Sequence, residues 1–304
     1  MAASGPAAEP RPGAVAVWLH AARIPTLAAA VVPVLVGTAL AARDGAFRAG
    51  PAVAAFLGAV LIQIGTNLAN DLGDHRRGAD TGARLGPRRA LQQGWLTPVQ
   101  VRNGAALCFA AAALAGVYLA WAAGWPVIAI GLASIAAGVA YTAGPYPLAY
   151  NGLGEIFVFL FFGLVAVCGT YFVQARALHP WVLLASVPVG VLAMAILVVN
   201  NVRDIETDRE TGKRTLAVRM GRERTRAVYR SLLMTAYLAL FTLVLSGHAG
   251  SWTLLPLLTL PLGFAEIRRV ELREDGPSLN RALRGTARLQ IAFGLLFALG
   301  LLLP

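Results

Sequence analysis

Two short acidic stretches carry most of the chemistry that this sequence could perform. They cover residues 67–80 and 200–210, and together they hold seven of the 15 Asp and Glu residues. Each stretch follows a long apolar run, where a carboxylate is costly to desolvate unless it pairs with or holds a cation. The two clusters are therefore the first candidates for a functional site. Their central aspartates are Asp71, Asp74, Asp204 and Asp208.

The polar residues of the two clusters repeat a helical spacing. Asn67 precedes Asp71 by four residues, and Asn200 precedes Asp204 by four. Positions four apart share one face of a helix, so each cluster presents an amide and two carboxylates in one direction. The second aspartate follows after three residues in one cluster and after four in the other. The spacing thus leaves open which aspartate of each pair would contact a metal directly.

Oxygen ligands on two facing helices suit Mg²⁺, which binds through a few carboxylates together with substrate phosphates and water. Nearby cations would take the remaining phosphate oxygens. Lys213, the only lysine, and Arg219 could do this, although anchoring at a membrane surface would also explain them. Arg84, Arg88 and Arg89 could hold either a diphosphate or the carboxylate of a second substrate. The sequence shows neither a Walker Gly-rich loop nor a metal-binding His pair, so nucleotide hydrolysis and zinc chemistry lack support.

The elements that position these clusters are membrane helices. Hydrophobic residues make up 57% of the chain and charged residues only 13%, well below the roughly 25% charged residues of a soluble domain. Nine apolar windows are long enough, or nearly so, to cross the hydrocarbon core. They are predicted near residues 15–42, 51–70, 104–123, 126–143, 154–174, 180–200, 228–247, 251–266 and 286–303. The prediction is a single all-α membrane domain over residues 14–304, preceded by a disordered tail at residues 1–13.

The basic residues fix an orientation for these nine spans. With the amino terminus in the cytoplasm, 23 Lys and Arg fall on the cytoplasmic side and only Arg43, Arg48 and Arg176 on the other. This split follows the positive-inside rule, and it places both acidic clusters at cytoplasmic ends. Because the basic residues adjoin membrane spans, topology and anionic lipids account for the net charge of +11, and nucleic-acid binding is rejected.

A diphosphate held at the membrane surface with an apolar tunnel behind it implies a substrate with a hydrocarbon tail, namely a prenyl diphosphate. A metal would favour departure of the diphosphate and formation of an allylic cation, and aromatic faces would stabilise that cation. The candidate aromatic residues are Tyr141, Tyr146, Tyr150, Phe157 and Phe161. Interfacial anchoring would equally explain any one of them.

Several motifs of this sequence resemble the UbiA superfamily of intramembrane prenyltransferases. They are residues 67–80, Arg84 to Gly94, Tyr141 to Pro147, Gly152 to Glu155, and Asn200 to Arg219. Within the superfamily, the resemblance is greatest to the branch that prenylates 1,4-dihydroxy-2-naphthoate for menaquinone synthesis. It implies a nine-helix bundle in the inner membrane that transfers a polyprenyl chain from polyprenyl diphosphate, with Mg²⁺ and with loss of CO₂.

The resemblance also implies a set of site residues. Asp71, Asp74, Asp204 and Asp208 become the catalytic and metal-binding residues. The substrate-binding residues become Asn67, Asn70, Asn200, Asn201, Arg84, Arg88, Lys213, Arg219, Tyr141 and Glu155. For Glu155, which opens a predicted span, the helix dipole alone would also favour an acid.

Two alternatives remain open at the level of the sequence. The same chemistry could act on another acceptor, such as 4-hydroxybenzoate or homogentisate. Alternatively, the acids could line the pathway of a cation transporter. A transporter predicts acids near the midplane, whereas these lie at helix ends among Arg-rich loops, which suits a metal bound to an anion better.

Overall fold

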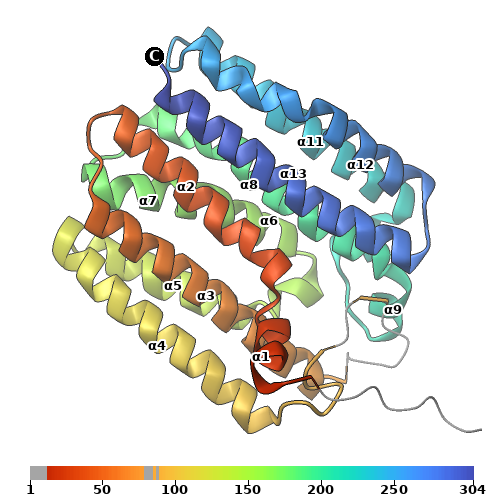
Figure 1. The fold of residues 1–304 in the computed structure, drawn as a ribbon. Coiled ribbons are helices and arrows are strands. Elements are labelled where there is room, and N and C mark those ends of the chain that lie inside the picture. Colours follow the sequence, from red (N-terminus) through yellow and green to blue (C-terminus); the bar gives the residue numbers. More distant parts are fainter. Residues whose placement is uncertain (1–11, 79–84, 87–88) are drawn as a thin grey trace, which may run out of the picture.

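The computed structural model describes residues 12–78, 85–86 and 89–304, and every regular element in these ranges is a helix (Figure 1). The helices are α1 (Ala14–Ala22), η1 (Ile24–Leu27), α2 (Ala28–Arg43), α3 (Ala49–Arg76), α4 (Pro98–Ala123), α5 (Pro126–Ala140), η2 (Leu148–Asn151), α6 (Gly154–Val158), η3 (Phe159–Val165), α7 (Ala166–Ala175), α8 (Pro180–Arg203), α9 (Ile205–Glu210), α10 (Leu216–Met220), α11 (Arg222–Leu245), η4 (Ser251–Thr259), α12 (Leu260–Leu272) and α13 (Gly276–Leu302). The prediction of an all-α protein is confirmed.

Seven helical stretches of the described chain are long and apolar enough to cross a membrane. They begin at Ile24, Ala49, Pro98, Gly154, Pro180, Arg222 and Gly276. The predicted count of nine is not confirmed. The fourth predicted span corresponds to α5, which has only 15 residues, and the eighth is divided between η4 and α12.

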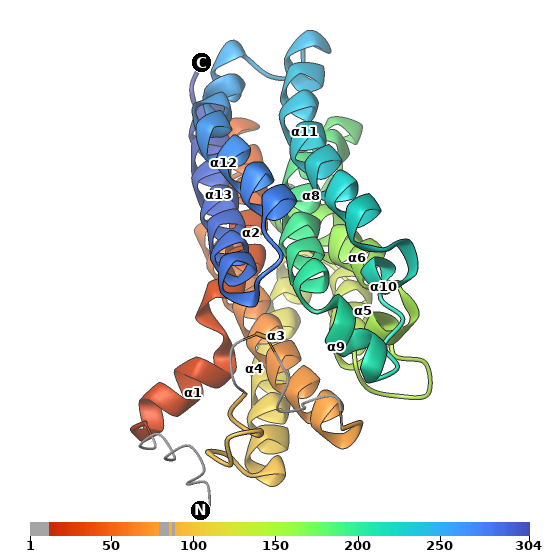
Figure 2. The same cartoon turned by 90° about the vertical axis from the view of Figure 1, so that its right-hand side faces the viewer.

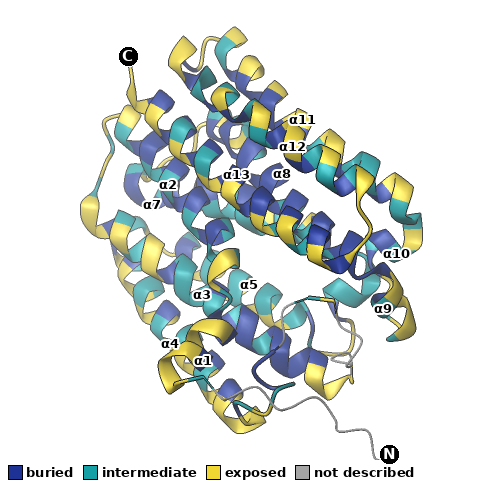
Figure 3. Cartoon of the chain, turned by 45° about the vertical axis from the view of Figure 1, so that its right-hand side comes forward, coloured by how far each residue is buried: buried dark blue, intermediate teal, exposed yellow. Residues whose placement is uncertain are grey.

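The long helices pack side by side as a bundle. On one side α3 contacts α4 and α5, on the other α8 contacts α11 and α13, and α2 connects the two sides through α13 and α7. Apolar side chains on the outer faces of α4 and α11 are exposed, as in Leu114 and Leu238, while α8 is mostly buried (Figure 3). This distribution places α8 at the centre and leaves apolar surface for lipid.

Both acidic clusters lie at one end of the bundle. Figure 2 shows the carboxyl end of α3 and the short helix α9 at the same end as α1, while the chain ends at Pro304 on the opposite side. The prediction that the two clusters emerge on the same side is consistent with this arrangement.

The first predicted span, residues 15–42, is broken near its start. Arg23 closes α1 in the left-handed backbone region (φ 53°, ψ 60°), and η1 then leads into α2. The hydroxyl of Thr26 accounts for part of this geometry, since it donates to the Arg23 carbonyl at 2.8 Å. Consequently α1 turns away from α2 and packs through Val17 and Ala21 against Leu68 at the end of α3.

The fifth span is also irregular, because η3 forms π-type turns between α6 and α7. At this level the backbones of η3 and α8 approach closely at a pair of glycines: a Cβ on Gly163 would lie 2.7 Å from the Cα of Gly190. The wider turns of a π-helix rotate the side chains that follow them. They leave Phe161 and Phe162 lining the interior cavity rather than the contact with α8.

Candidate active site

A cavity of about 400 Å³ opens among the helices and connects both acidic clusters with an apolar chamber. Its polar end is lined by residues of α3, of the end of α8 and of α9. These residues include Asn67, Asn70, Asp74, Asn200, Asn201, Asp204 and Asp208. The cavity continues to Ala55, Leu119, Val127 and Val173, the last three of which form a small apolar cluster at the other end of the bundle.

Lys213 joins the two clusters across the cavity. Its ammonium lies 3.3 Å from a carboxylate oxygen of Asp74 on α3 and 3.9 Å from one of Asp208 on α9. The backbone holds this position, since the Lys213 amide donates to the Asp208 carbonyl at 2.8 Å. The two clusters therefore face one another across the cavity. The predicted continuous helix through the second cluster is wrong, because α8 ends at Arg203 and α9 begins at Ile205, with Asp204 at the break.

Asp74 has two further partners. The Tyr150 hydroxyl donates to it at 2.8 Å, and the Arg89 guanidinium lies 2.6 Å from its other oxygen. Burial, followed by the adjacent Asp74 carboxylate, raises the pKa of the Tyr150 phenol, so Tyr150 stays protonated and acts as a donor. The Lys213 ammonium also lies over the Tyr150 ring, 4.9 Å from its centre.

Asp71 is held differently from Asp74. It is buried, it forms a close ion pair with Arg23, and it lies 3.4 Å from Arg89. Asp71 does not line the cavity in the described part of the chain, whereas Asp74 does. Through its ion pair with Arg23, Asp71 holds α3 against the turn between α1 and α2.

In the second cluster, the Arg203 guanidinium donates to both carboxylate oxygens of Asp204, from Nε at 2.7 Å and from Nη2 at 2.5 Å. Arg203 also donates to Asn200 at 2.8 Å and to Asn280 of α13 at 2.7 Å. A Cβ on Gly86 would lie 2.7 Å from Arg203, so a glycine is needed where this loop meets the buried guanidinium. Arg203 thus connects the loop after α3 with the second cluster and with α13.

The asparagines position helices relative to one another. Asn67 donates to the Ala22 carbonyl at 2.9 Å and to the Thr26 hydroxyl at 3.0 Å. Asn70 accepts from Thr142 at 3.0 Å, and Asn201 donates to the buried carboxylate of Glu155 at 2.9 Å. Glu155 lines the cavity on the side opposite α3.

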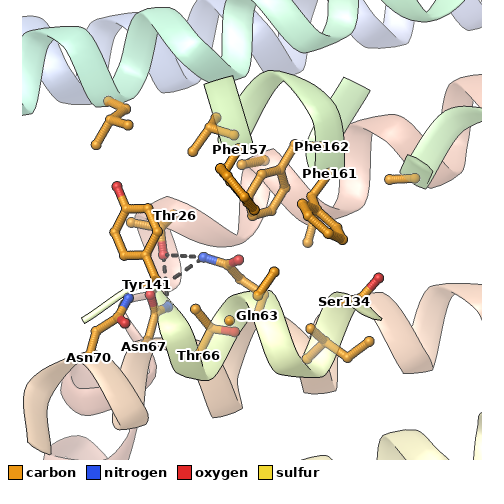
Figure 4. Close-up of a pocket in the computed structure, with 18 of the residues that line it drawn as sticks. Thr26, Gln63, Thr66, Asn67, Asn70, Ser134, Tyr141, Phe157, Phe161 and Phe162 are labelled. Carbon is orange, nitrogen blue, oxygen red and sulfur yellow. Dashed lines mark hydrogen bonds between the residues drawn. The ribbon is translucent and has the colours of Figure 1, made fainter. Parts of the chain in front are cut away.

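Aromatic side chains surround the chamber behind the polar end. Tyr141, Phe157, Phe161 and Phe162 line it, and the rings of Phe157 and Phe161 stack with centroids 6.0 Å apart (Figure 4). Tyr146, predicted as another candidate, is 60% exposed and lies away from this cavity. The stacked rings fit a hydrocarbon chain or an aromatic substrate.

Four further predicted residues lie either outside the described chain or outside the cavity lining. Arg84 and Arg88, together with Asp80, lie outside the described residues. Arg219 donates to the Arg214 carbonyl at 3.1 Å and lies outside the cavity lining of the described chain. Through this bond Arg219 supports the loop that carries Lys213. The same loop is also held by the Arg214 amide, which donates to the Tyr150 carbonyl.

Other residues of the site were not predicted. Tyr150 was considered only as an aromatic face, but it is a hydrogen-bond donor to Asp74. Gln63 was missed, although it precedes Asn67 by four residues and so shares its helical face. Asn280 was missed as well, because nothing in the sequence indicates that α13 reaches the second cluster.

The comparisons with known proteins show the family of this chain. The sequence model of the UbiA prenyltransferase family matches residues 30–300. The chain belongs to the UbiA prenyltransferase family. With its long apolar helices, it is a multi-pass membrane protein of that family.

Several curated relatives in the UbiA family carry the same name. The proteins named 1,4-dihydroxy-2-naphthoate octaprenyltransferase from Escherichia coli (strain K12) and Mycobacterium tuberculosis are 37% and 40% identical to it over 292 and 282 residues. These alignments cover 94% and 92% of this chain and 95% of each relative. The protein of that name from Bacillus subtilis is 33% identical over 278 residues, covering 91% of this chain and 89% of the relative.

Solved structures of UbiA homologues share the fold. The apo structure from Aeropyrum pernix K1 superposes with a TM-score of 0.68 at 14% identity, covering 88% of this chain and 97% of the other. The homologue from Archaeoglobus fulgidus, described as bound to DMAPP and Mg²⁺, gives a TM-score of 0.63 at 16% identity, covering 92% and 99%.

Proposed function

We propose that this protein transfers a polyprenyl chain from polyprenyl diphosphate to 1,4-dihydroxy-2-naphthoate with loss of CO₂, giving demethylmenaquinol for menaquinone synthesis. The relatives named for this acceptor support the choice of substrate, since they are 33–40% identical along most of the chain. A different UbiA acceptor, such as 4-hydroxybenzoate or homogentisate, is the competing assignment.

One observation carries the proposal. Lys213 lies between Asp74 and Asp208 at the polar end of a cavity whose other end is apolar. An anionic head with a long hydrocarbon tail is the ligand that such a cavity fits, because the cations attract the head and apolar walls accept the tail.

The donor set at this end fits Mg²⁺. Asp74, Asp204 and Asp208 line the cavity, and their carboxylate oxygens are the hard ligands that Mg²⁺ prefers. Within the described ranges, no three His, Cys, Asp or Glu side chains are grouped closely enough to enclose a metal. Diphosphate oxygens and water would therefore complete the coordination, as is usual for Mg²⁺. When bound, the metal supplies electrostatic stabilisation of the departing diphosphate.

The protein's own groups account for the remaining requirements. Lys213 and Arg89 form ion pairs with Asp74, and both cations are placed to bind diphosphate oxygens. The aromatic walls at Phe157 and Phe161 exclude water and face an allylic cation with their π-electrons. The ring carbon that bears the carboxylate attacks this allylic cation. The product is a β-keto acid, which loses CO₂ without a cofactor.

We further propose Asp74, Asp204 and Asp208, which line the cavity, as the metal-binding and catalytic residues, with Asp74 and Asp208 nearest to the diphosphate. The fourth predicted aspartate, Asp71, would instead position α3 through its ion pair with Arg23. The enzyme would lie in the inner membrane with its amino terminus and acidic clusters in the cytoplasm, a proposal that rests on the 23 to 3 distribution of basic residues.

The test uses purified enzyme, a panel of prenyl diphosphates and acceptors labelled at the carboxyl carbon. We expect release of labelled CO₂ from 1,4-dihydroxy-2-naphthoate and a prenylated quinol by mass spectrometry, both lost in excess chelator and restored by Mg²⁺. Faster turnover of 4-hydroxybenzoate with its carboxylate retained would contradict the assignment.

A further inference from the structure

Gln63 is a buried amide in the chamber that the proposed chemistry does not use. It lies on α3 two helical turns before Asp71, about 12 Å away along the helix axis, and its side chain lines the cavity. The residue is only 7% exposed. A buried amide within a membrane span is costly unless its polar atoms are bonded, so its partners need explanation.

The hydrogen bonds around Gln63 fix which way its amide points. The Thr26 hydroxyl donates to the Arg23 carbonyl at 2.8 Å, so its oxygen accepts from its other neighbours. Asn67 uses its NH₂ group on Ala22 and Thr26, which leaves its own carbonyl as an acceptor. Gln63 must therefore turn its NH₂ group toward Thr26 and Asn67, and both contacts are 3.4 Å.

The carbonyl oxygen Oε1 of Gln63 consequently faces the chamber. Within the described part of the chain, it accepts no hydrogen bond. Figure 4 shows the carbonyl pointing away from Thr26 and Asn67, into the space on the side of Phe157, Phe161 and Phe162. The result is an oriented carbonyl acceptor whose nearest aromatic neighbours in the lining are apolar.

An oriented acceptor of this kind selects for a ligand that carries a donor. A prenyl tail has no N–H or O–H group, and an ionised diphosphate would be repelled by the carbonyl dipole. An aromatic acceptor with a ring hydroxyl offers both a flat apolar surface for Phe157 and Phe161 and an O–H donor for Gln63. We infer that Gln63 is a positioning residue that accepts a hydrogen bond from a ring hydroxyl of the aromatic acceptor.

This inference rests on the proposed function only in its choice of acceptor, and it assigns the acceptor's place in the chamber. Thr26 and Asn67 gain a second role from it, because they hold the Gln63 amide in the orientation that presents Oε1. The acceptor would then lie deeper in the bundle than the diphosphate, on the α3 side and beneath the aromatic rings.

Binding measured without turnover tests the inference. The affinities of 1,4-dihydroxy-2-naphthoate and its two mono-O-methyl ethers are measured by calorimetry on purified protein with inorganic diphosphate and Mg²⁺. We expect the wild type to bind the free hydroxyl form about ten- to a hundredfold more tightly than one of the ethers. In Gln63→Leu that ratio should fall close to one, because the acceptor atom is gone.

The matched control is Gln290→Leu, which removes another fully buried glutamine from a membrane helix, α13, away from the cavity. It should keep the wild-type ratio. Gln63→Met, which preserves side-chain length, replaces Gln63→Leu should the latter fail to fold. An equal ratio in the wild type and the Gln63 variant, or the absence of discrimination by the wild type, would overturn the inference.

The outcome is separable from that of the proposed function. Discrimination between the hydroxyl and the ether without prenyl transfer would support the binding role of Gln63 and contradict the enzymatic assignment. Prenyl transfer without discrimination between the hydroxyl and the ether would support the enzymatic assignment and contradict the binding role of Gln63.

Discussion

Asp74 is the aspartate of the first cluster that faces the cavity, while Asp71 is turned toward Arg23. We therefore expect Asp74→Asn to lower kcat/KM by about a hundredfold or more, since one carboxylate ligand of the proposed Mg²⁺ site is lost. The Mg²⁺ concentration needed for half-maximal activity should rise as well. Initial rates measured over a range of Mg²⁺ concentrations check both effects.

The control for this change is Asp44→Asn. Asp44 also bonds a tyrosine, with the Tyr171 hydroxyl 2.6 Å away, but it lies at the other end of α2 and outside the cavity. It should leave the Mg²⁺ dependence unaltered. An Asp74→Asn enzyme with wild-type metal dependence would remove Asp74 from the metal site.

Lys213 gives a second prediction. Its ammonium is the group that lies between the two clusters, so we expect Lys213→Met to raise the KM for prenyl diphosphate about tenfold and to leave the KM for the acceptor nearly unchanged. Steady-state kinetics with each substrate varied in turn separates the two constants. The exposed neighbour Arg214→Met is the comparison, and equal effects of the two changes would refute a specific role for Lys213.

Among the elements, the close approach of η3 and α8 has a direct energetic consequence. A Cβ on Gly163 would lie 2.7 Å from the Cα of Gly190, and neither backbone can move aside in a packed bundle. We expect Gly163→Ala to destabilise the protein by about 1–3 kcal/mol. Unfolding in detergent, followed by circular dichroism, measures the loss.

Gly169 supplies the matched change, because it lies six residues further along the same helical run and a Cβ there meets nothing within 4 Å. Gly169→Ala should be neutral or slightly stabilising, since alanine favours a helix more than glycine does. Equal destabilisation by both substitutions would show that the contact with α8 is not tight.

The elements also show what local sequence patterns could not reveal. Hydropathy placed the fifth span correctly, but it could not reveal the π-type turns of η3 or the close approach of Gly163 to Gly190, which are distant in sequence. Likewise, residues 15–42 read as one apolar window, and the left-handed turn at Arg23 divides it. The hydrogen bond from Thr26 to the Arg23 carbonyl is local, but the bond from Asn67 to the Ala22 carbonyl, which also stabilises that turn, forms only once α3 has packed beside it.

For the molecule as a whole, the spacing of two acidic clusters and the sidedness of the charges predicted a common site, and Lys213 lies between the clusters as that prediction requires. The deeper part of the site could not be predicted in the same way. Gln63 and Asn280 belong to helices whose rotation and neighbours are set by packing, and a single polar residue in an apolar run does not indicate what it faces.

The orientation in the membrane is the remaining property of the whole molecule that the charges predict. Glu210 at the end of α9 and Ser251 at the start of η4 are both exposed, and they lie at opposite ends of the bundle (Figure 2). Single cysteines at these positions, in a protein with Cys108 and Cys168 replaced by alanine, report on the two sides independently.

An impermeant maleimide should modify Ser251→Cys in right-side-out vesicles and Glu210→Cys only in inverted vesicles or after permeabilisation. Mass shifts on gels give the extent of labelling. The reverse pattern would place the acidic clusters outside, where the excess of basic residues would oppose the positive-inside rule, and it would contradict the proposed cytoplasmic site. Labelling of both positions from one side would contradict the membrane-crossing arrangement of the bundle itself.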